Sequence, residues 1–159
     1  MARTKTISDK LAKRMCAEWL RNKEFDNIEL AKNSSCDLFG NKDGQKYFIE
    51  VKYSSKDDGN FFGTVMLTEM FQAISNKNNY LFLVCRGQDE DINNWFFKLF
   101  NVDDFLKCCT LTTPIFHYHL HPDQNNNLTI PNFKESTMVA SQKLIEEMWK
   151  DFKKWKLKS

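Results

Sequence analysis

The sequence lacks several features that would place the chain in familiar classes. No uninterrupted apolar run approaches the roughly 18 residues of a membrane span, and the opening MARTKTISDK has no apolar secretion segment. The five cysteines are odd in number and form no C-x-x-C pair, and no Walker-type or G-x-G-x-x-G loop occurs. We therefore expect a reduced, cytoplasmic protein that neither spans a membrane, nor depends on disulfides, nor hydrolyses nucleotides.

What the chain does have is enough apolar bulk for one core. Its 159 residues are 42% hydrophobic and 28% charged, and they include fourteen phenylalanines and four tryptophans. At this length, without an internal repeat or an interdomain linker, the sequence predicts a single domain over residues 1–159.

The net charge of +2 is too small to indicate nucleic-acid binding by itself, but the charge is unevenly distributed. Residues 1–23 hold seven Lys or Arg against two acids, and residues 140–159 hold six against three, so the middle of the chain is acidic. Basic ends around an acidic middle fit a protein that holds a polyanion at its ends and a cation in its centre. They fit solvated helix ends equally well.

The order of hydrophobic periodicities predicts an α/β or α+β domain with a mixed central sheet flanked by helices. Helices are expected at 7–23, about 68–77 and 137–156, with a helical turn at 102–106. Strands are expected within 25–33, 34–39, 45–54, 61–67, 80–85 and 95–102, with a turn in GNKDG (40–44) and a final hairpin over 114–131.

Glu18 stands out in the first predicted helix. At about 100° per residue, Ile7, Leu11, Met15 and Trp19 form an apolar arc that Ala12 and Cys16 continue. Glu18 projects only about 20° from Leu11. A carboxylate on the packed side of a helix requires a partner, a cation or a water-filled cleft. The alternative is that Glu18 lies at the edge of the arc and reaches solvent.

The segment SSCDLFGNKDGQKYFIEVKYSS (34–55) interrupts a strand-like run with charges. Side chains alternate along a strand, so Glu50 and Lys52 share a face and lie roughly 6.6 Å apart. Asp37 sits across a short turn on the partner strand. Two carboxylates and an ammonium that face one point can form a hard-cation site, since Mg²⁺ takes one or two carboxylates and completes its shell with water and phosphate. The alternative is an ordinary hairpin with exposed cross-strand charges.

Asp37, then twelve residues, then Glu50-Val51-Lys52 resembles the D…(D/E)-x-K signature of the PD-(D/E)XK nuclease superfamily, the restriction-endonuclease-like fold. AEWLRNKEFDNIEL resembles the opening of its Mrr-like and archaeal Holliday-junction-resolvase branch, and FFGTVMLTEMFQA…NYLFLVC resembles the helix and strand that follow the signature. The resemblance covers about residues 7–86 as a nuclease-like core. Residues 87–159, expected to add strands and an amphipathic helix, match nothing we can name. Cys36 stands where the name-giving proline would be.

The resemblance implies a Mg²⁺-dependent nuclease, with Mn²⁺ able to substitute, that hydrolyses phosphodiester bonds of duplex or branched DNA. It implies an endonuclease of restriction, resolvase or mobile-element type, and by analogy a homodimer. The catalytic residues it implies are Asp37, Glu50 and Lys52. The metal ligands it implies are Glu18, Asp37, Glu50 and the backbone carbonyl of Val51.

Glu69 and Gln72, on the helix after the signature, are candidates for supporting contacts around this site. The bound cation would make a water more acidic and neutralise charge on the phosphate, while Lys52 would orient or deprotonate that water or stabilise the developing charge. The alternative function is a catalytically inert nucleic-acid-binding or protein-interaction module on the same fold.

Other groups of residues compete less well. His117, His119 and His121 share one predicted strand face, and such an array can bind zinc, but no second ligand pair has structural-zinc spacing. We expect a polar strand face instead, one that contacts phosphate in the nuclease interpretation. Cys108 or Cys109 with a histidine base would be a nucleophilic pair, yet no local context exposes a particular cysteine.

The C-terminal segment WKDFKKWKLKS interleaves lysines with aromatic residues. Lys150, Lys153 and Lys154 are candidates for phosphate contacts. The alternative is a core-packing helix whose last-turn lysines suit the negative end of its dipole.

Overall fold

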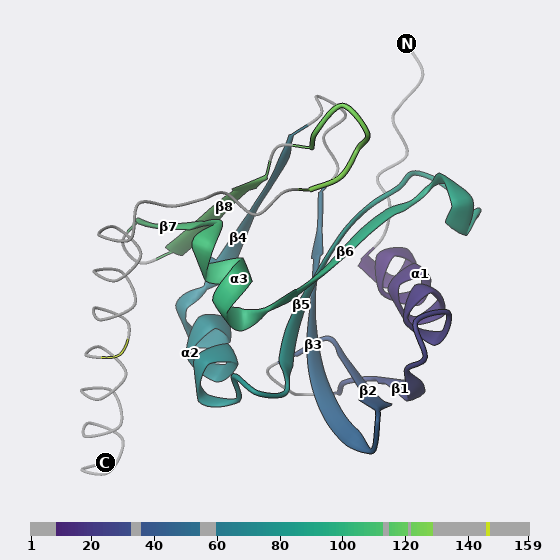
Figure 1. Cartoon of the computed structure of the whole chain (residues 1–159), viewed down its shortest axis with the longest axis horizontal. Coiled ribbons are helices and arrows are strands. Elements are labelled where there is room, and N and C mark those ends of the chain that lie inside the picture. The colour runs from purple at the N-terminus through teal and green to yellow at the C-terminus, as the bar shows by residue number, and fades with distance from the viewer. Residues whose placement is uncertain are drawn as a thin grey trace.

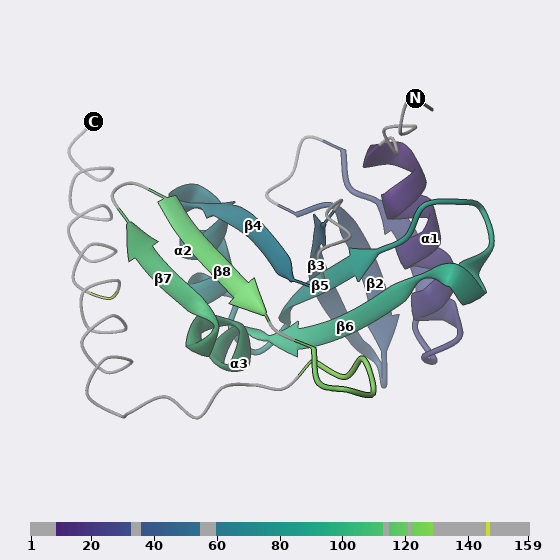
Figure 2. The ribbon, with the colours of Figure 1, turned by 90° about the horizontal axis from the view of Figure 1, so that it is seen from above.

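The computed structural model describes residues 9–32, 36–54, 60–112, 115–120, 122–128 and 146. A five-stranded sheet in the order β1-β2-β3-β5-β6 forms its centre, and a three-stranded sheet in the order β4-β8-β7 lies beside it (Figures 1 and 2). The elements in chain order are α1 (Asp9–Arg21), β1 (Asp26–Leu30), β2 (Leu38–Lys42), β3 (Gln45–Tyr53), β4 (Phe61–Met66), α2 (Leu67–Ser75), β5 (Tyr80–Arg86), the short 3-10 helix η1 (Ile92–Asn94), β6 (Phe96–Asn101), α3 (Val102–Lys107), β7 (Cys109–Thr112) and β8 (Ile115–Leu120).

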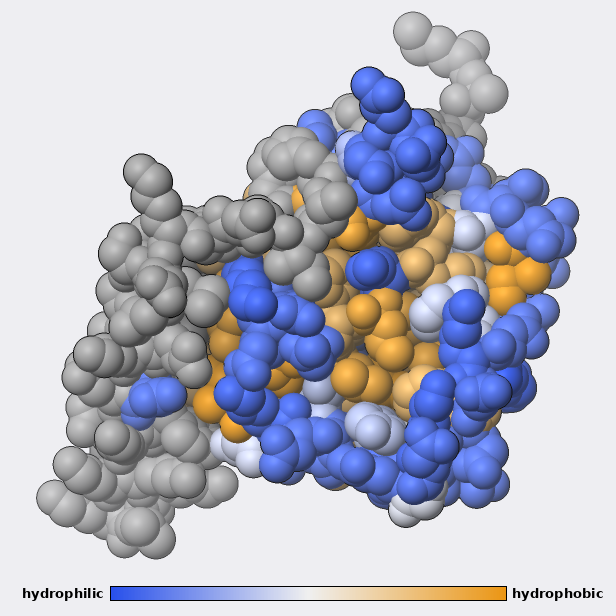
Figure 3. Space-filling model, in the orientation of Figure 1, coloured by the Kyte–Doolittle hydropathy of each residue, from blue (hydrophilic) through white to orange (hydrophobic). Residues whose placement is uncertain are grey.

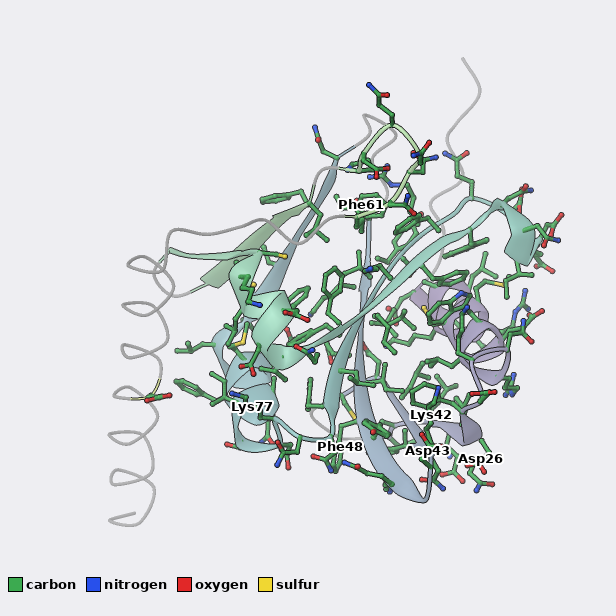
Figure 4. All side chains as sticks on the ribbon, in the orientation of Figure 1. Asp26, Lys42, Asp43, Phe48, Phe61 and Lys77 are labelled. Atoms are coloured by element: carbon green, nitrogen blue, oxygen red, sulfur yellow. The ribbon has the colours of Figure 1, made fainter. Side chains whose placement is uncertain are left out.

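The first three strands form an antiparallel meander, and the β2–β3 turn is two residues long. Lys42 pairs with Gln45 across it, and both turn residues have positive φ, 52° at Asp43 and 76° at Gly44. This geometry is favoured in hairpins because its twist matches that of the strands. Figure 4 shows Asp43 at the tip of the hairpin, near Lys42 and Asp26. The turn therefore uses only the end of GNKDG, and Gly40 lies within β2.

The sheet is mixed because β3 and β5 are parallel while β5 and β6 are antiparallel. A parallel neighbour requires a crossover, and the chain between β3 and β5 supplies it with β4 and α2. Strand β5 is covered on both faces, since Phe82, Leu83, Val84 and Cys85 are all fully buried. The continuous apolar run at 80–85 predicted such a strand, and this prediction is confirmed.

The core consists of one apolar layer on each face of the central sheet. On one face, the buried residues of α1 (Ala12, Met15, Cys16 and Leu20) pack against β3 and β5. On the other face, α2, α3 and β4 cover the sheet. Figure 3 shows apolar surface over the middle of the central sheet, bordered by hydrophilic residues.

The predicted mixed sheet with flanking helices is confirmed. In chain order, α1 and the β1–β2–β3 meander are followed by β4, α2 and β5, and β5 lies beside β3 in the sheet. No helix in the described part of the chain is long and apolar enough to cross a membrane. The predicted helix at 137–156 lies outside the described residues except for Glu146, which is helical.

The predicted final hairpin over 114–131 lies only partly within the described residues, which contain its first strand as β8 and a turn in its Asn-rich segment. Strand β8 pairs with β4 and β7, and β7 was not predicted. Beyond β8, an isolated antiparallel β-bridge between Pro122 and Leu128 joins the two ends of the Asn-rich segment. The carboxylate of Asp123 accepts the N–H groups of Asn125 and Asn127, which forms a tight turn at the predicted Asn-rich tip.

Candidate active site

Asp37, just before β2, is fixed at both carboxylate oxygens. Its Oδ2 accepts the backbone N–H of Val51 at 2.8 Å, and its Oδ1 lies 2.7 Å from Nζ of Lys13. Its backbone N–H donates to the carbonyl of Ile49, and the Leu38–Ile49 pair follows in the ladder, so Asp37 lies opposite Glu50. Adjacent antiparallel strands therefore bring the two predicted carboxylates together.

Glu50 and Lys52 share one face of β3, as strand alternation predicted. Nζ of Lys52 lies 2.9 Å from Oε1 of Glu50 and 2.7 Å from Oε2 of Glu69 on α2. Glu69 also accepts the backbone N–H of Met66 at 2.8 Å, which secures the carboxylate at the start of α2. Lys52 is thus held between two carboxylates from different elements.

Burial dominates the electrostatics of this cluster. Glu50 is only 6% exposed, and loss of solvent raises the pKa of Glu50 to about 8, against the lowering effect of Lys52 and with a further rise from Asp37 and Glu69. Burial also lowers the pKa of Lys52, but Glu50 and Glu69 outweigh that effect and the net shift is upward. Lys52 is therefore a persistent ammonium, suited to donating hydrogen bonds rather than to removing a proton.

The prediction that Glu18 lies on the buried face of α1 is wrong, and the solvent-exposed alternative is correct. The buried face of α1 is centred near Ala12 and Cys16 rather than on Leu11. Glu18 projects about 120° from Ala12 at 100° per residue and is exposed. A helix wheel anchored on Leu11, a residue at the edge of the arc, produced the error.

Lys13 is the residue that α1 contributes instead. Its Nζ lies 2.7 Å from Asp37 and 2.8 Å from Oδ2 of Asp9, and its side chain is 23% exposed. The wheel placed Lys13 outside the apolar arc, and sequence reasoning gave it no role. The available signal was the Asp9–Lys13 spacing of four residues at the edge of that arc, typical of an ordered ion pair.

Of the two supporting candidates on α2, Glu69 reaches the cluster and Gln72 does not. Glu69 contacts Lys52, whereas Gln72 is exposed. The backbone N–H of Val51 donates a hydrogen bond to Asp37, a contact that the sequence did not predict. The proposed role of its carbonyl stays a prediction.

Arg86 is a second residue that the sequence did not single out. It ends β5, and its Nη2 donates to Oγ of the buried Ser54 at 3.4 Å and to the carbonyl of Asn60. Its guanidinium lies 3.8 Å from the ring centre of Phe61. These contacts join the end of β3 to the start of β4, just beyond Lys52.

The rival groups gain little from the structure. His117 and His119 lie on β8, opposite Thr64 and Phe62 of β4, but their side chains, His121 and Lys150, Lys153 and Lys154 all lie outside what the structure describes. Burial raises the pKa of the Cys108 thiol to about 11, which disfavours a thiolate nucleophile.

The cluster fits a divalent cation in donor type and charge. In the described residues, no three His, Cys, Asp or Glu side chains gather as a metal-binding group. Asp37 and Glu50 are nevertheless hard oxygen donors on adjacent strands. Asp37 pairs with Lys13, while Glu50 and Glu69 pair with Lys52. With all three carboxylates ionised, as a cation would require of its ligands, these five groups carry one formal negative charge. Mg²⁺ tolerates a site with only two carboxylates, because water and phosphate supply its remaining ligands.

The chain resembles known proteins in its structure, but comparisons of its sequence found no match. No protein-family model and no curated protein sequence matches the chain. The Holliday junction resolvase Hjc from Archaeoglobus fulgidus is 14% identical, with a TM-score of 0.47 over 68% of this chain and 80% of that one. The bacterial homing endonuclease I-Ssp6803I is 18% identical, with a TM-score of 0.48 over 90% of this chain and 94% of that one.

Proposed function

We propose that the chain is a divalent-cation-dependent nuclease that hydrolyses phosphodiester bonds of DNA. One observation carries the proposal: Asp37, Glu50 and Lys52, picked out by their spacing in the sequence, lie close together, with Asp37 directly before β2 and opposite Glu50 of β3, and Lys52 paired with Glu50. Structural charge pairs are normally exposed and weakly stabilising. Here Glu50 is buried with a raised pKa, and such perturbed groups concentrate at functional sites.

Asp37 and Glu50 would hold the cation, which we propose to be Mg²⁺ or Mn²⁺, together with the carbonyl of Val51. When bound, the cation makes a water more acidic and neutralises charge on the phosphate. The Val51 N–H orients Asp37 by fixing one of its oxygens. Glu18, which is exposed on α1, is not included in this set.

Lys52 would stabilise the negative charge that develops on the phosphate and orient the attacking water. Its ammonium is positioned before substrate arrives, since Glu50 and Glu69 hold it from two sides. A donor arranged in advance needs no reorganisation during the reaction. Glu69 is thus a positioning residue for Lys52.

The test is cleavage of single-stranded, duplex and branched DNA with Mg²⁺ or Mn²⁺, and with a chelator in place of the cation. Asp37→Asn keeps the size of the side chain and an oxygen that can accept the Val51 N–H, but it removes the charge. Lys52→Met removes the ammonium and keeps the length. Each variant should lower the cleavage rate by roughly 10²–10³-fold.

Matched substitutions on the surface serve as controls. Asp43→Asn makes the same change at the hairpin tip, where asparagine tolerates the positive φ of 52°. Lys77→Met makes the second change at an exposed ion pair with Asp103. Both controls should cleave like the wild type. Undiminished cation-dependent cleavage by Asp37→Asn or Lys52→Met would contradict the catalytic assignment.

An inert DNA-binding or protein-interaction module is the second candidate. It is favoured by one observation, that Asp37 and Glu50 both already have lysine partners. Binding of all three DNA forms without cleavage, in either Mg²⁺ or Mn²⁺, would support it. The type of endonuclease (restriction, resolvase or mobile-element) remains a proposal, which the panel of DNA substrates would test. A homodimer for double-strand cutting also remains a proposal, which sedimentation would test.

A further inference from the structure

Lys13 forms an ion pair with the carboxylate oxygen of Asp37 that is best placed to bind a cation. The other oxygen, Oδ2, is held by the Val51 N–H, so Oδ1 is the one left for a ligand. Nζ of Lys13 lies 2.7 Å from this Oδ1, and the side chains of both residues are mostly shielded, at 23% and 18% exposure. A divalent cation on Oδ1 would stand beside a shielded ammonium of the same sign.

Lys13 has a second anchor that lets it leave Asp37 without losing every partner. Oδ2 of Asp9, one turn earlier on α1, lies 2.8 Å from the same ammonium. Asp9 is 79% exposed, so solvent screens much of its own charge. The ion pair with Asp37 can therefore break while Lys13 stays at the edge of the site.

The charge balance shows what the ammonium does to cation binding. With Glu50 ionised, as a bound cation would require, Lys13 and Lys52 opposite Asp37, Glu50 and Glu69 leave one formal negative charge. A divalent cation alone would then turn the site to one positive charge. A phosphodiester carries one negative charge and would restore neutrality. Without the Lys13 ammonium the site would have two negative charges, which the cation alone would balance.

We propose that Lys13 competes with the divalent cation for Asp37 and so makes loading of the cation depend on a bound phosphodiester. This inference rests on the proposed nuclease function, which supplies the cation and the substrate class. It goes further by assigning α1 an ammonium that couples the two binding events. Such coupling is reciprocal, so the cation must strengthen phosphodiester binding by the same factor.

The experiment measures Mn²⁺ affinity by calorimetry, with and without a phosphorothioate DNA duplex that resists cleavage. Without DNA, Lys13→Met should bind Mn²⁺ at least about tenfold more tightly than the wild type, because a like charge next to the cation is gone. The duplex should strengthen Mn²⁺ binding at least about tenfold in the wild type, but less than about threefold in Lys13→Met.

Three further variants locate the effect. Lys10→Met removes the same charge from an exposed position on α1 and should leave the affinity unchanged. Lys13→Arg keeps the charge and should behave like the wild type. Adding Asp37→Asn to Lys13→Met should abolish the gain. Circular dichroism before each titration establishes that the variants are folded.

The outcomes separate this inference from the nuclease function. If the wild type cleaves DNA through Asp37 but Lys13→Met binds Mn²⁺ no more tightly, the nuclease stands and the competition is overturned. Equal strengthening by DNA in both proteins would also overturn it. If Lys13→Met gains affinity but no DNA form is cleaved, the competition stands and the nuclease function falls.

Discussion

The two faces of β3 have opposite compositions within one strand. Tyr47, Ile49, Val51 and Tyr53 contribute to the apolar layer beneath α1. On the other face, Phe48 packs into the second layer, and Glu50, Lys52 and Ser54 follow it. Both faces are covered, so solvent exposure does not explain the difference.

Strand alternation lets one segment serve stability and chemistry without conflict. The apolar face needs only close packing, which contributes to stability in proportion to the area buried. The polar face keeps a carboxylate and an ammonium away from water, which packing alone would not favour. We therefore expect substitutions on the two faces to affect different properties.

The largest expected effect is on stability, from the face beneath α1. Ile49 is fully buried, so Ile49→Ala should lower the free energy of unfolding by about 2–5 kcal/mol through lost contacts and a cavity. Urea unfolding followed by circular dichroism measures this change.

Leu30→Ala is the matched control, since Leu30 is an apolar strand residue that is 56% exposed. It should change stability by less than about 0.5 kcal/mol. A loss below about 1 kcal/mol for Ile49→Ala would contradict the division of roles between the two faces.

A smaller effect, of opposite sign, is expected on the other face. The folded pKa of Glu50, about 8, lies above its ordinary value of 4.5. The protonated carboxyl therefore favours folding, and this contribution is lost as the pH rises through 8. In chelator at pH 9, Glu50→Gln should be more stable than the wild type by at least about 1 kcal/mol, the equivalent of a single pKa unit, and the gain should shrink toward pH 5.

Urea unfolding at both pH values tests this prediction. Glu29→Gln, at an exposed position on β1, should show no such pH-dependent gain. A Glu50→Gln variant less stable than the wild type at pH 9 would mean that the Glu50–Lys52 ion pair stabilises more than burial of the carboxylate destabilises.

How far the sequence predicted the site depended on the distance between residues along the chain. Asp37, Glu50 and Lys52 were predicted together because a short hairpin and a two-residue strand period fix their relation. Glu18 was predicted on the wrong face of its helix and Lys13 was given no role, since the orientation of a helix depends on packing across the sheet. The buried positions Ala12 and Cys16, small residues with little weight on an apolar wheel, set that orientation.

The same distinction holds for the fold. The order of the meander and the buried strand β5 carry strong local patterns, so they were predicted, although the strand expected within 34–39 is β2 at Leu38–Lys42. Strand β7 is only four residues long, and its place beside β8 and β4 follows from tertiary pairing. No local pattern in CTLT distinguishes such a strand from a loop.

The smallest expected effect lies at the turn that sets the register of both faces. Gly44 has a φ of 76° and open space around the position of a Cβ, so Gly44→Ala introduces backbone strain and no clash. Its free energy of unfolding should fall by roughly 1 kcal/mol, while Gly44→Asn should lose less because asparagine tolerates this conformation. Because the site lies at the other end of β3, cation-dependent cleavage should be unchanged in both variants. A cleavage rate that falls together with stability would show that register at the turn and geometry at Glu50 are coupled, contrary to the separation of the two faces.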